Sequence, residues 1–126
     1  MGNDAEMAAH AAGTAERFAG ALIAGDAGTA ARLFSPAGTC LSRDGTEVRG
    51  PAAIGALLRQ VTDSEHRLAI HLGRTIIGGD VAFSTQFWTQ RSRPPEREGF
   101  ESISTARLVL GRGGSGWEIL IASPWE

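Results

Sequence analysis

The chain has 126 residues, of which 42% are apolar and 21% charged, and its formal net charge is −2. This size and apolar content suit one domain with a buried core, so we expect residues 1–126 to form a single domain. The absence of a basic surplus argues against a nucleic-acid partner, and the lack of an export segment or a long apolar run predicts a cytoplasmic protein without a membrane partner.

Helical periodicity predicts two helices at the start of the chain. Apolar residues recur at intervals of three and four from about Asp4 to about Ala24, which indicates one long amphipathic helix. Asp26 can cap a second, short helix that carries Phe34. This helix is short because Pro36 prevents it from continuing. The sequence therefore predicts a tight corner between two helices.

A short strand and a third helix follow. Residues 38–42 predict a strand, and the Asp44-Gly45 turn leads into residues 46–49. Proline is favoured in the first turn of a helix, so Pro51 is expected to open the third helix.

In the second half of the chain the period of the apolar pattern changes to two. Alternation predicts a strand from His66 to a turn at 78–80, a second from Val81 to a loop at 92–96, a third over 100–110 and a last over 117–123. Helices in the first half and strands in the second predict an α+β fold. We expect three N-terminal helices packed on one strongly curved, mainly antiparallel sheet.

The residues available for proton transfer are few. All twelve basic residues are arginine, and the chain contains neither lysine nor tyrosine. Schiff-base chemistry and a phenolic acid are therefore excluded. The single cysteine, Cys40, cannot form an internal disulfide, and no histidine or helix start lies near it in sequence, so we interpret it as a structural thiol in a reducing compartment.

Several strings in this order resemble the SnoaL-like branch of the nuclear-transport-factor-2-like superfamily. They are residues 18–26, the Asp44-Gly45 turn followed by 48–54, residues 79–82 and residues 117–119. The resemblance implies an α+β cone with a deep apolar pocket, frequent dimerisation through the outer face of the sheet, and no obligatory cofactor. Members of this superfamily include polyketide cyclases, isomerases, dehydratases, epoxide hydrolases and proteins that only bind ligands, so the fold does not imply one reaction.

The chain departs from these relatives at the positions that carry chemistry. The isomerase branch uses a tyrosine together with aspartates, and this chain has no tyrosine. Many relatives carry a histidine or an acid near the end of the closing strand, where this chain has residues 121–125 without either. No catalytic residue of the family therefore carries over to this sequence.

Four polar residues are the candidates for catalysis: His71, Arg107, Gln86 and Ser123. His71 is either a general base in the pocket or a histidine at a sheet surface or subunit interface. Arg107, in the middle of a strand, either polarises a substrate carbonyl from the inner face or forms an interface salt bridge on the outer face. Which of these holds depends on which face of the sheet is concave.

Large apolar side chains are the candidates for walls of a substrate pocket, although core packing is the alternative for most of them. They are Phe18, Leu22, Phe34, Phe83, Trp88, Trp117 and Trp125. Trp88 has the better claim to a pocket, because it shares its strand face with the polar residues Gln86 and Ser84.

No metal site is expected, because an odd separation sends His66 and His71 to opposite faces of their strand. We predict a small, cofactor-independent cyclase or isomerase for an apolar, polyketide-like natural product, in which pocket shape enforces the folded conformation of the substrate. The alternative is a non-catalytic module that binds a small molecule or mediates dimerisation. A homodimer is expected in both cases, because apolar residues on both faces of the sheet need cover.

Overall fold

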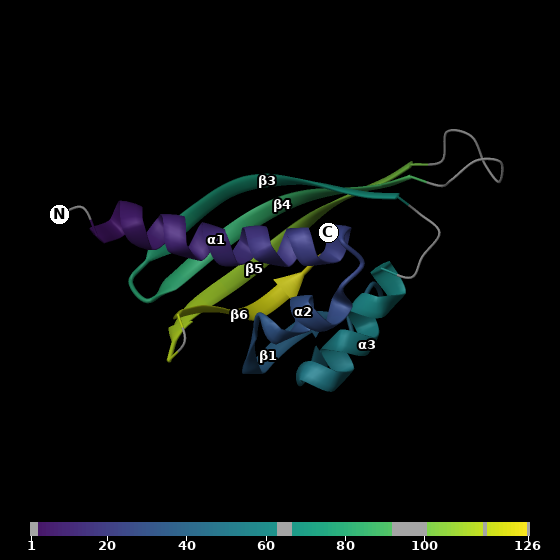
Figure 1. Ribbon diagram of the computed structural model, residues 1–126, viewed down its shortest axis with the longest axis horizontal. Helices are drawn as coiled ribbons and strands as arrows, with labels where there is room; N and C mark the ends of the chain where they lie inside the picture. Colours follow the sequence, from purple (N-terminus) through teal and green to yellow (C-terminus); the bar gives the residue numbers. More distant parts are fainter. Residues whose placement is uncertain (1–2, 63–66, 92–100, 115, 126) are drawn as a thin grey trace.

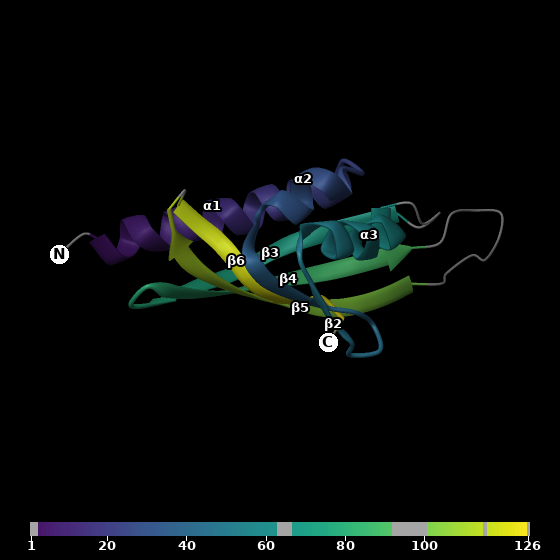
Figure 2. The ribbon, with the colours of Figure 1, turned by 90° about the horizontal axis from the view of Figure 1, so that it is seen from below.

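Three helices lie on one face of a curved, six-stranded sheet (Figures 1 and 2). The computed structural model describes residues 3–62, 67–91, 101–114 and 116–125. The helices are α1 (Asn3–Ile23), α2 (Ala27–Arg32) and α3 (Pro51–Thr62). The strands are β1 (Phe34–Leu41), β2 (Glu47–Arg49), β3 (Arg67–Gly78), β4 (Val81–Arg91), β5 (Glu101–Gly113) and β6 (Gly116–Ser123).

The sheet is mainly antiparallel and open. Its strand order is β2-β1-β6-β5-β4-β3, and only the pairing of β1 with β6 is parallel. The register shifts between Leu72 and Thr75 in β3 and between Val109 and Leu110 in β5. Such irregularities increase the local bend and twist of a sheet. The predicted α+β architecture, with one curved sheet packed on three helices, is confirmed.

Most of the predicted elements are present, but Phe34 is not helical. The helix α2 ends at Arg32, and Phe34 is the first residue of β1. The backbone carbonyl of Leu33 accepts a hydrogen bond from Ile119 of β6, so the chain joins the sheet as soon as the helix ends. Pro36 lies inside β1, within the stretch where the register between β1 and β6 shifts, and a proline is tolerated at such an irregularity. His66 lies outside the described residues.

The two faces of the sheet differ in burial and in polarity, as strand β4 shows. In β4, Ser84, Gln86 and Trp88 face the helices and are at most 2% exposed. Their alternating neighbours Phe83 and Phe87 lie on the opposite face and are 40% and 47% exposed. We call these the inner and the outer face. The inner face of β4 is thus its more polar face, and the outer face is its more apolar one.

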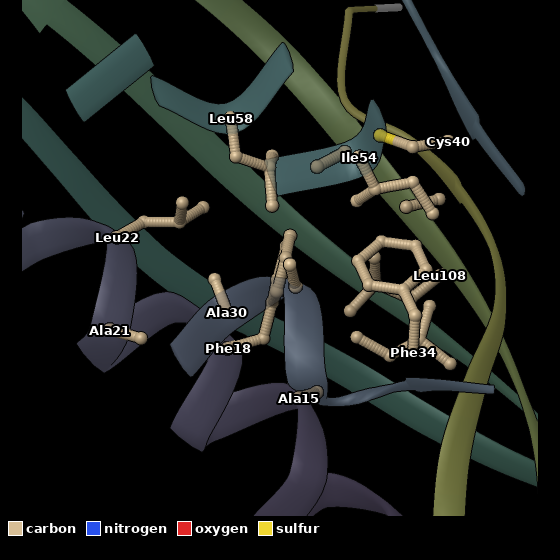
Figure 3. Close-up of a cluster of buried hydrophobic side chains, with 14 of the residues drawn as sticks. Ala15, Phe18, Ala21, Leu22, Ala30, Phe34, Cys40, Ile54, Leu58 and Leu108 are labelled. Atoms are coloured by element: carbon tan, nitrogen blue, oxygen red, sulfur yellow. The ribbon is translucent and has the colours of Figure 1, made fainter. Parts of the chain in front are cut away.

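The core fills the space between the inner face and the helices (Figure 3). Phe18 of α1 points toward Leu58 of α3 and Phe34 of β1, with Leu108 of β5 beside them. Small residues in α1, among them Ala15, bring the helix close to the sheet, where it packs on β3, β4 and β6. Within the described residues, none of the helices combines the length and apolarity needed to cross a membrane.

Candidate functional site

Gln86 and Trp88 form the polar centre of the inner face. Their side chains are 0% and 1% exposed. The Gln86 Nε2 donates to the carbonyl oxygen of Ala15 in α1 at 2.8 Å, and the Trp88 Nε1 donates to the Gln86 Oε1 at 3.0 Å. An unpaired amide or indole N–H in a core is costly, so this pairing stabilises both side chains. Gln86 thereby links the sheet to the long helix.

Two further buried polar residues lie between the helix and the sheet. The Thr14 Oγ1 of α1 donates to the carbonyl oxygen of Trp117 at 3.1 Å, and Ser84 pairs with Thr75 through their hydroxyl oxygens at 3.1 Å. Among the described residues, no buried side-chain nitrogen or oxygen is left without a partner. Sequence analysis missed Thr14, although a threonine on the alanine-rich face of the first helix is the signal that could have indicated it.

The other three candidates for catalysis lie on the outer face. His71 pairs in register with Phe87, and Arg107 pairs with Thr85 on one side and Ser123 on the other. The side chains of His71 and Arg107 are exposed. The structure therefore places Arg107 externally, which was one of its two alternatives. The four candidates do not meet at one site, because Gln86 faces the helices and the other three face away from them.

The candidates for pocket walls also divide between the faces. Phe18, Leu22 and Phe34 are buried in the core, and Trp117 is 9% exposed. Phe83 was expected to contribute to an internal pocket, but it lies on the outer face. The reason is parity, since an odd separation from Trp88 along one strand sends Phe83 to the opposite face.

Aromatic contacts extend from the core to the surface. Phe18 packs edge-on against Phe34 with ring centroids 5.8 Å apart, and Phe18 lies 6.3 Å from Trp88. Trp88 in turn contacts the half-buried Trp125 edge-on at 5.7 Å. Edge-to-face pairs of this kind are favourable beyond the area that they bury.

Near Trp125 the inner face is no longer fully covered. On β4 and β5 the inner-facing side chains change from buried at Gln86 and Ala106 to half-buried at Gln90 and Ser104. The inner-facing side chains of the edge strand β3 are half-buried or exposed along its length, including those of Leu68, Ile70 and Leu72. We call this region the half-buried end; it comprises Leu68, Ile70, Gln90, Ser104 and Trp125. It offers apolar and aromatic surface together with a neutral amide and a hydroxyl.

The titratable groups of the described residues are almost all at the surface. The exception is Cys40, whose thiol pKa is raised by burial from 9.0 to about 12, so it remains protonated and unreactive near neutral pH. Hydrogen bonds from Ser42 and Thr46 lower the pKa of the exposed Asp44 to about 2. No described histidine, aspartate or glutamate is buried on the inner face. The described residues contain no cluster of three or more side chains that could hold a metal ion.

Comparison with known proteins adds evidence at the level of the fold. No protein-family model matches the sequence, and the search of curated proteins gives no match. Among solved structures, a domain with a cystatin-like fold from Nostoc punctiforme has a TM-score of 0.76 at 20% identity, covering 99% of this chain and 78% of its own. A protein of the NTF2-like family from Streptomyces avermitilis, suggested to be a dehydratase, has a TM-score of 0.75 at 18% identity, with 96% and 97% covered.

The chain therefore has the NTF2-like cone fold. A third similar structure, from Catenulispora acidiphila, has a ketosteroid isomerase-like fold and was solved in complex with trimethylamine. Its TM-score is 0.71 at 13% identity, covering 90% of this chain and 84% of its own. Similarity at these identities establishes the fold and not the reaction, because one fold hosts many functions.

Proposed function

We propose that this chain is a SnoaL-like small-molecule-binding protein that holds a flat, apolar ligand at the half-buried end. The observation that carries the proposal is the chemistry of the inner face, which presents aromatic and aliphatic side chains with only neutral polar groups among the described residues. Ligand sites of this kind are mostly apolar, with a few polar groups that set orientation.

The half-buried end supplies both components. Leu68 and Ile70 of β3 lie beside Gln90 and Trp88 of β4 in the register, and Trp125 approaches Trp88 from the end of β6. The surface open to an apolar ligand here is mainly that of Leu68 and Ile70, with the half-buried Trp125 beside them. The NH2 group of the Gln90 amide and the hydroxyl of Ser104 can donate hydrogen bonds to an oxygen of the ligand.

The cyclase or isomerase remains a second candidate, favoured by the same neutral interior. Catalysis by shape needs no titratable group, because holding a flexible chain in a reactive fold removes much of the entropic barrier. No cofactor is required by either candidate. Conversion of a polyketide-like substrate above its uncatalysed rate would favour the cyclase, and tight binding without conversion would favour the binding protein.

The binding proposal is tested with the neutral, planar fluorophore N-phenyl-1-naphthylamine and the variant Leu68→Glu. A carboxylate at this half-buried position is expected to weaken binding about tenfold or more, because it places a charge where the ligand's apolar surface would lie. Fluorescence titration measures the dissociation constant, and near-ultraviolet circular dichroism checks that the core packing is retained.

Ala69→Glu is the matched control, since it adds the same charge at the next residue of β3, which pairs with Thr89 on the outer face. We expect its dissociation constant to equal that of the unmodified chain. Equal weakening by both variants, or no saturable binding by the unmodified chain, would overturn the proposal.

We also propose that the chain forms a homodimer through its outer face. Six large apolar side chains on this face are 40% to 72% exposed. They make up what we call the outer-face patch: Ile76, Val81, Phe83, Phe87, Ile103 and Ile121. A contiguous apolar surface on a soluble domain usually marks an interaction site. A second copy of the same chain would cover it by a two-fold symmetric contact.

A further inference from the structure

An arginine, a glutamine and a tryptophan from three separate parts of the chain meet beside the half-buried end. Arg43 belongs to the loop between β1 and β2, Gln90 lies near the end of β4, and Trp125 follows β6. The Arg43 guanidinium carbon lies 4.5 Å from the centroid of the Trp125 ring. The Arg43 Nη2 donates to the Gln90 Oε1 at 3.1 Å.

The Trp125 ring that lies beneath the Arg43 guanidinium is itself held in place by two contacts. The Trp125 Nε1 donates to the carbonyl oxygen of Leu41 at 3.1 Å, and its ring packs edge-on against Trp88. These two contacts orient the ring, and the guanidinium of Arg43 lies over its face. A guanidinium held over an indole ring by a cation–π contact can still donate hydrogen bonds through its N–H groups. Of the five such donors in Arg43, the Gln90 contact uses one.

Arg43 forms no ion pair with the carboxylates of its own hairpin among the described residues. Asp44 accepts hydrogen bonds from Ser42 and from the backbone of Thr46, and Glu47 pairs with Arg49. Both carboxylates nearest to Arg43 in sequence thus have other partners. Within the described residues Arg43 contacts only neutral groups, an amide oxygen and an aromatic face.

We infer that Arg43 binds the anionic group of the ligand, and that the ligand class is a planar, apolar molecule carrying one carboxylate or a similar acidic group. This inference rests on the proposed function, because the apolar part of the molecule lies on the half-buried end. Guanidinium and carboxylate form charge-assisted, bidentate hydrogen bonds that fix orientation as well as adding affinity. Arg43 is then a specificity-determining residue at the edge of the binding site.

The test compares two probes that differ only by an anionic group, N-phenyl-1-naphthylamine and 8-anilinonaphthalene-1-sulfonate. For the unmodified chain we expect the sulfonate to bind more tightly, by about fivefold or more at low salt. Arg43→Gln is expected to abolish that advantage, measured as the ratio of the two dissociation constants within the same variant. Arg49→Gln is the matched control, because Arg49 lies on β2 of the same hairpin and already pairs with Glu47.

The outcomes separate this inference from the proposal beneath it. If the unmodified chain binds both probes with equal affinity, or if Arg43→Gln weakens both equally, the anion inference is overturned while ligand binding stands. If Arg49→Gln has the same effect as Arg43→Gln, general charge attraction explains the preference and the assignment to Arg43 fails. If neither probe binds saturably, the proposed function fails and the inference fails with it. Selective loss of sulfonate binding in Arg43→Gln alone supports it.

Discussion

Among single residues, the buried polar groups between the helices and the inner face set the hydrogen bonding of the core. Gln86 satisfies both the carbonyl of Ala15 and the indole of Trp88. Thr14 and Ser84 are likewise paired. None of these groups titrates near neutral pH. They orient the core and can donate or accept hydrogen bonds, but they cannot exchange a proton with a ligand as a general acid or base does.

Above pH 9.0 the pH dependence of the free energy of unfolding is expected to come from one side chain, Cys40. The chain lacks lysine and tyrosine, so Cys40 is the one side chain that titrates between pH 9.0 and about 12. Its pKa is raised in the folded state, so the unfolded chain loses this proton first. The stability contributed by the protonated thiol is therefore complete below pH 9.0 and is lost as the pH rises toward about 12.

We expect the free energy of unfolding to fall with pH in this window by at most about 1.4 kcal/mol per pH unit. Urea unfolding at several pH values measures the slope. In Cys40→Ala the same plot is expected to be flat, although this variant is less stable at neutral pH because it leaves a small cavity. A slope that persists unchanged in Cys40→Ala would show that another process controls the alkaline transition.

Among the elements, β1 shows most clearly how neighbouring strands override local signals. Phe34 and Pro36 read as the end of a helix in sequence, yet both belong to a strand that is hydrogen-bonded to β6. Gly38 lies at the irregular part of this strand. A Cβ there would approach the backbone oxygens of Ser35 and Ile119 to 2.9 Å, so only glycine fits without a shift of the main chain.

Gly38→Ala is therefore expected to lower the free energy of unfolding by about 1–3 kcal/mol, because the obstructing atoms are backbone. Gly20→Ala is the matched control, since Gly20 is an exposed position in α1 where an added Cβ would meet nothing within 4 Å apart from its chain neighbours and the backbone of its own helix. There we expect a gain of about 0.5–1 kcal/mol from helix propensity. Chemical denaturation of both variants measures the difference, and equal effects of either sign would contradict this account of β1.

For the whole molecule, we expect the outer face to decide the oligomeric state. The outer-face patch leaves its apolar area uncovered in a single chain, so association is expected to be driven mainly by the hydrophobic effect. His71 and Arg107 lie on the same face as the patch. If the dimer forms as proposed, these two residues belong to its interface or rim rather than to the ligand site.

Ile103→Glu tests the dimer. Ile103 is the most exposed of the patch residues at 72%, so a charge there costs the single chain little but is buried on association. Multi-angle light scattering is expected to give twice the chain mass of 13.2 kDa for the unmodified protein and the single mass for the variant. Ile23→Glu, at a 55% exposed position on α1, should remain dimeric. A monomeric unmodified chain, or a dimeric Ile103→Glu, would contradict the proposal.

The sequence by itself determined the α+β class, the helices from α1 to α3 apart from the end of α2, and the alternation along each strand. These features depend on local periodicity and on turn residues, which are visible in the sequence itself. It also determined that no lysine or tyrosine chemistry is available. That Gln86 and Trp88 share one face of their strand followed from their even separation in sequence alone.

Only the tertiary structure decided which face of the sheet is the inner one. In β4 the more apolar set, with Phe83 and Phe87, faces outward, and the set with Gln86 faces the helices. Alternation fixes which residues share a face but not which face the helices cover, because that depends on the direction of sheet curvature and on the small residues of α1. For the same reason the contact of Arg43 with Trp125 could not be predicted, since contacts between segments distant in sequence follow from the tertiary structure and not from the local pattern.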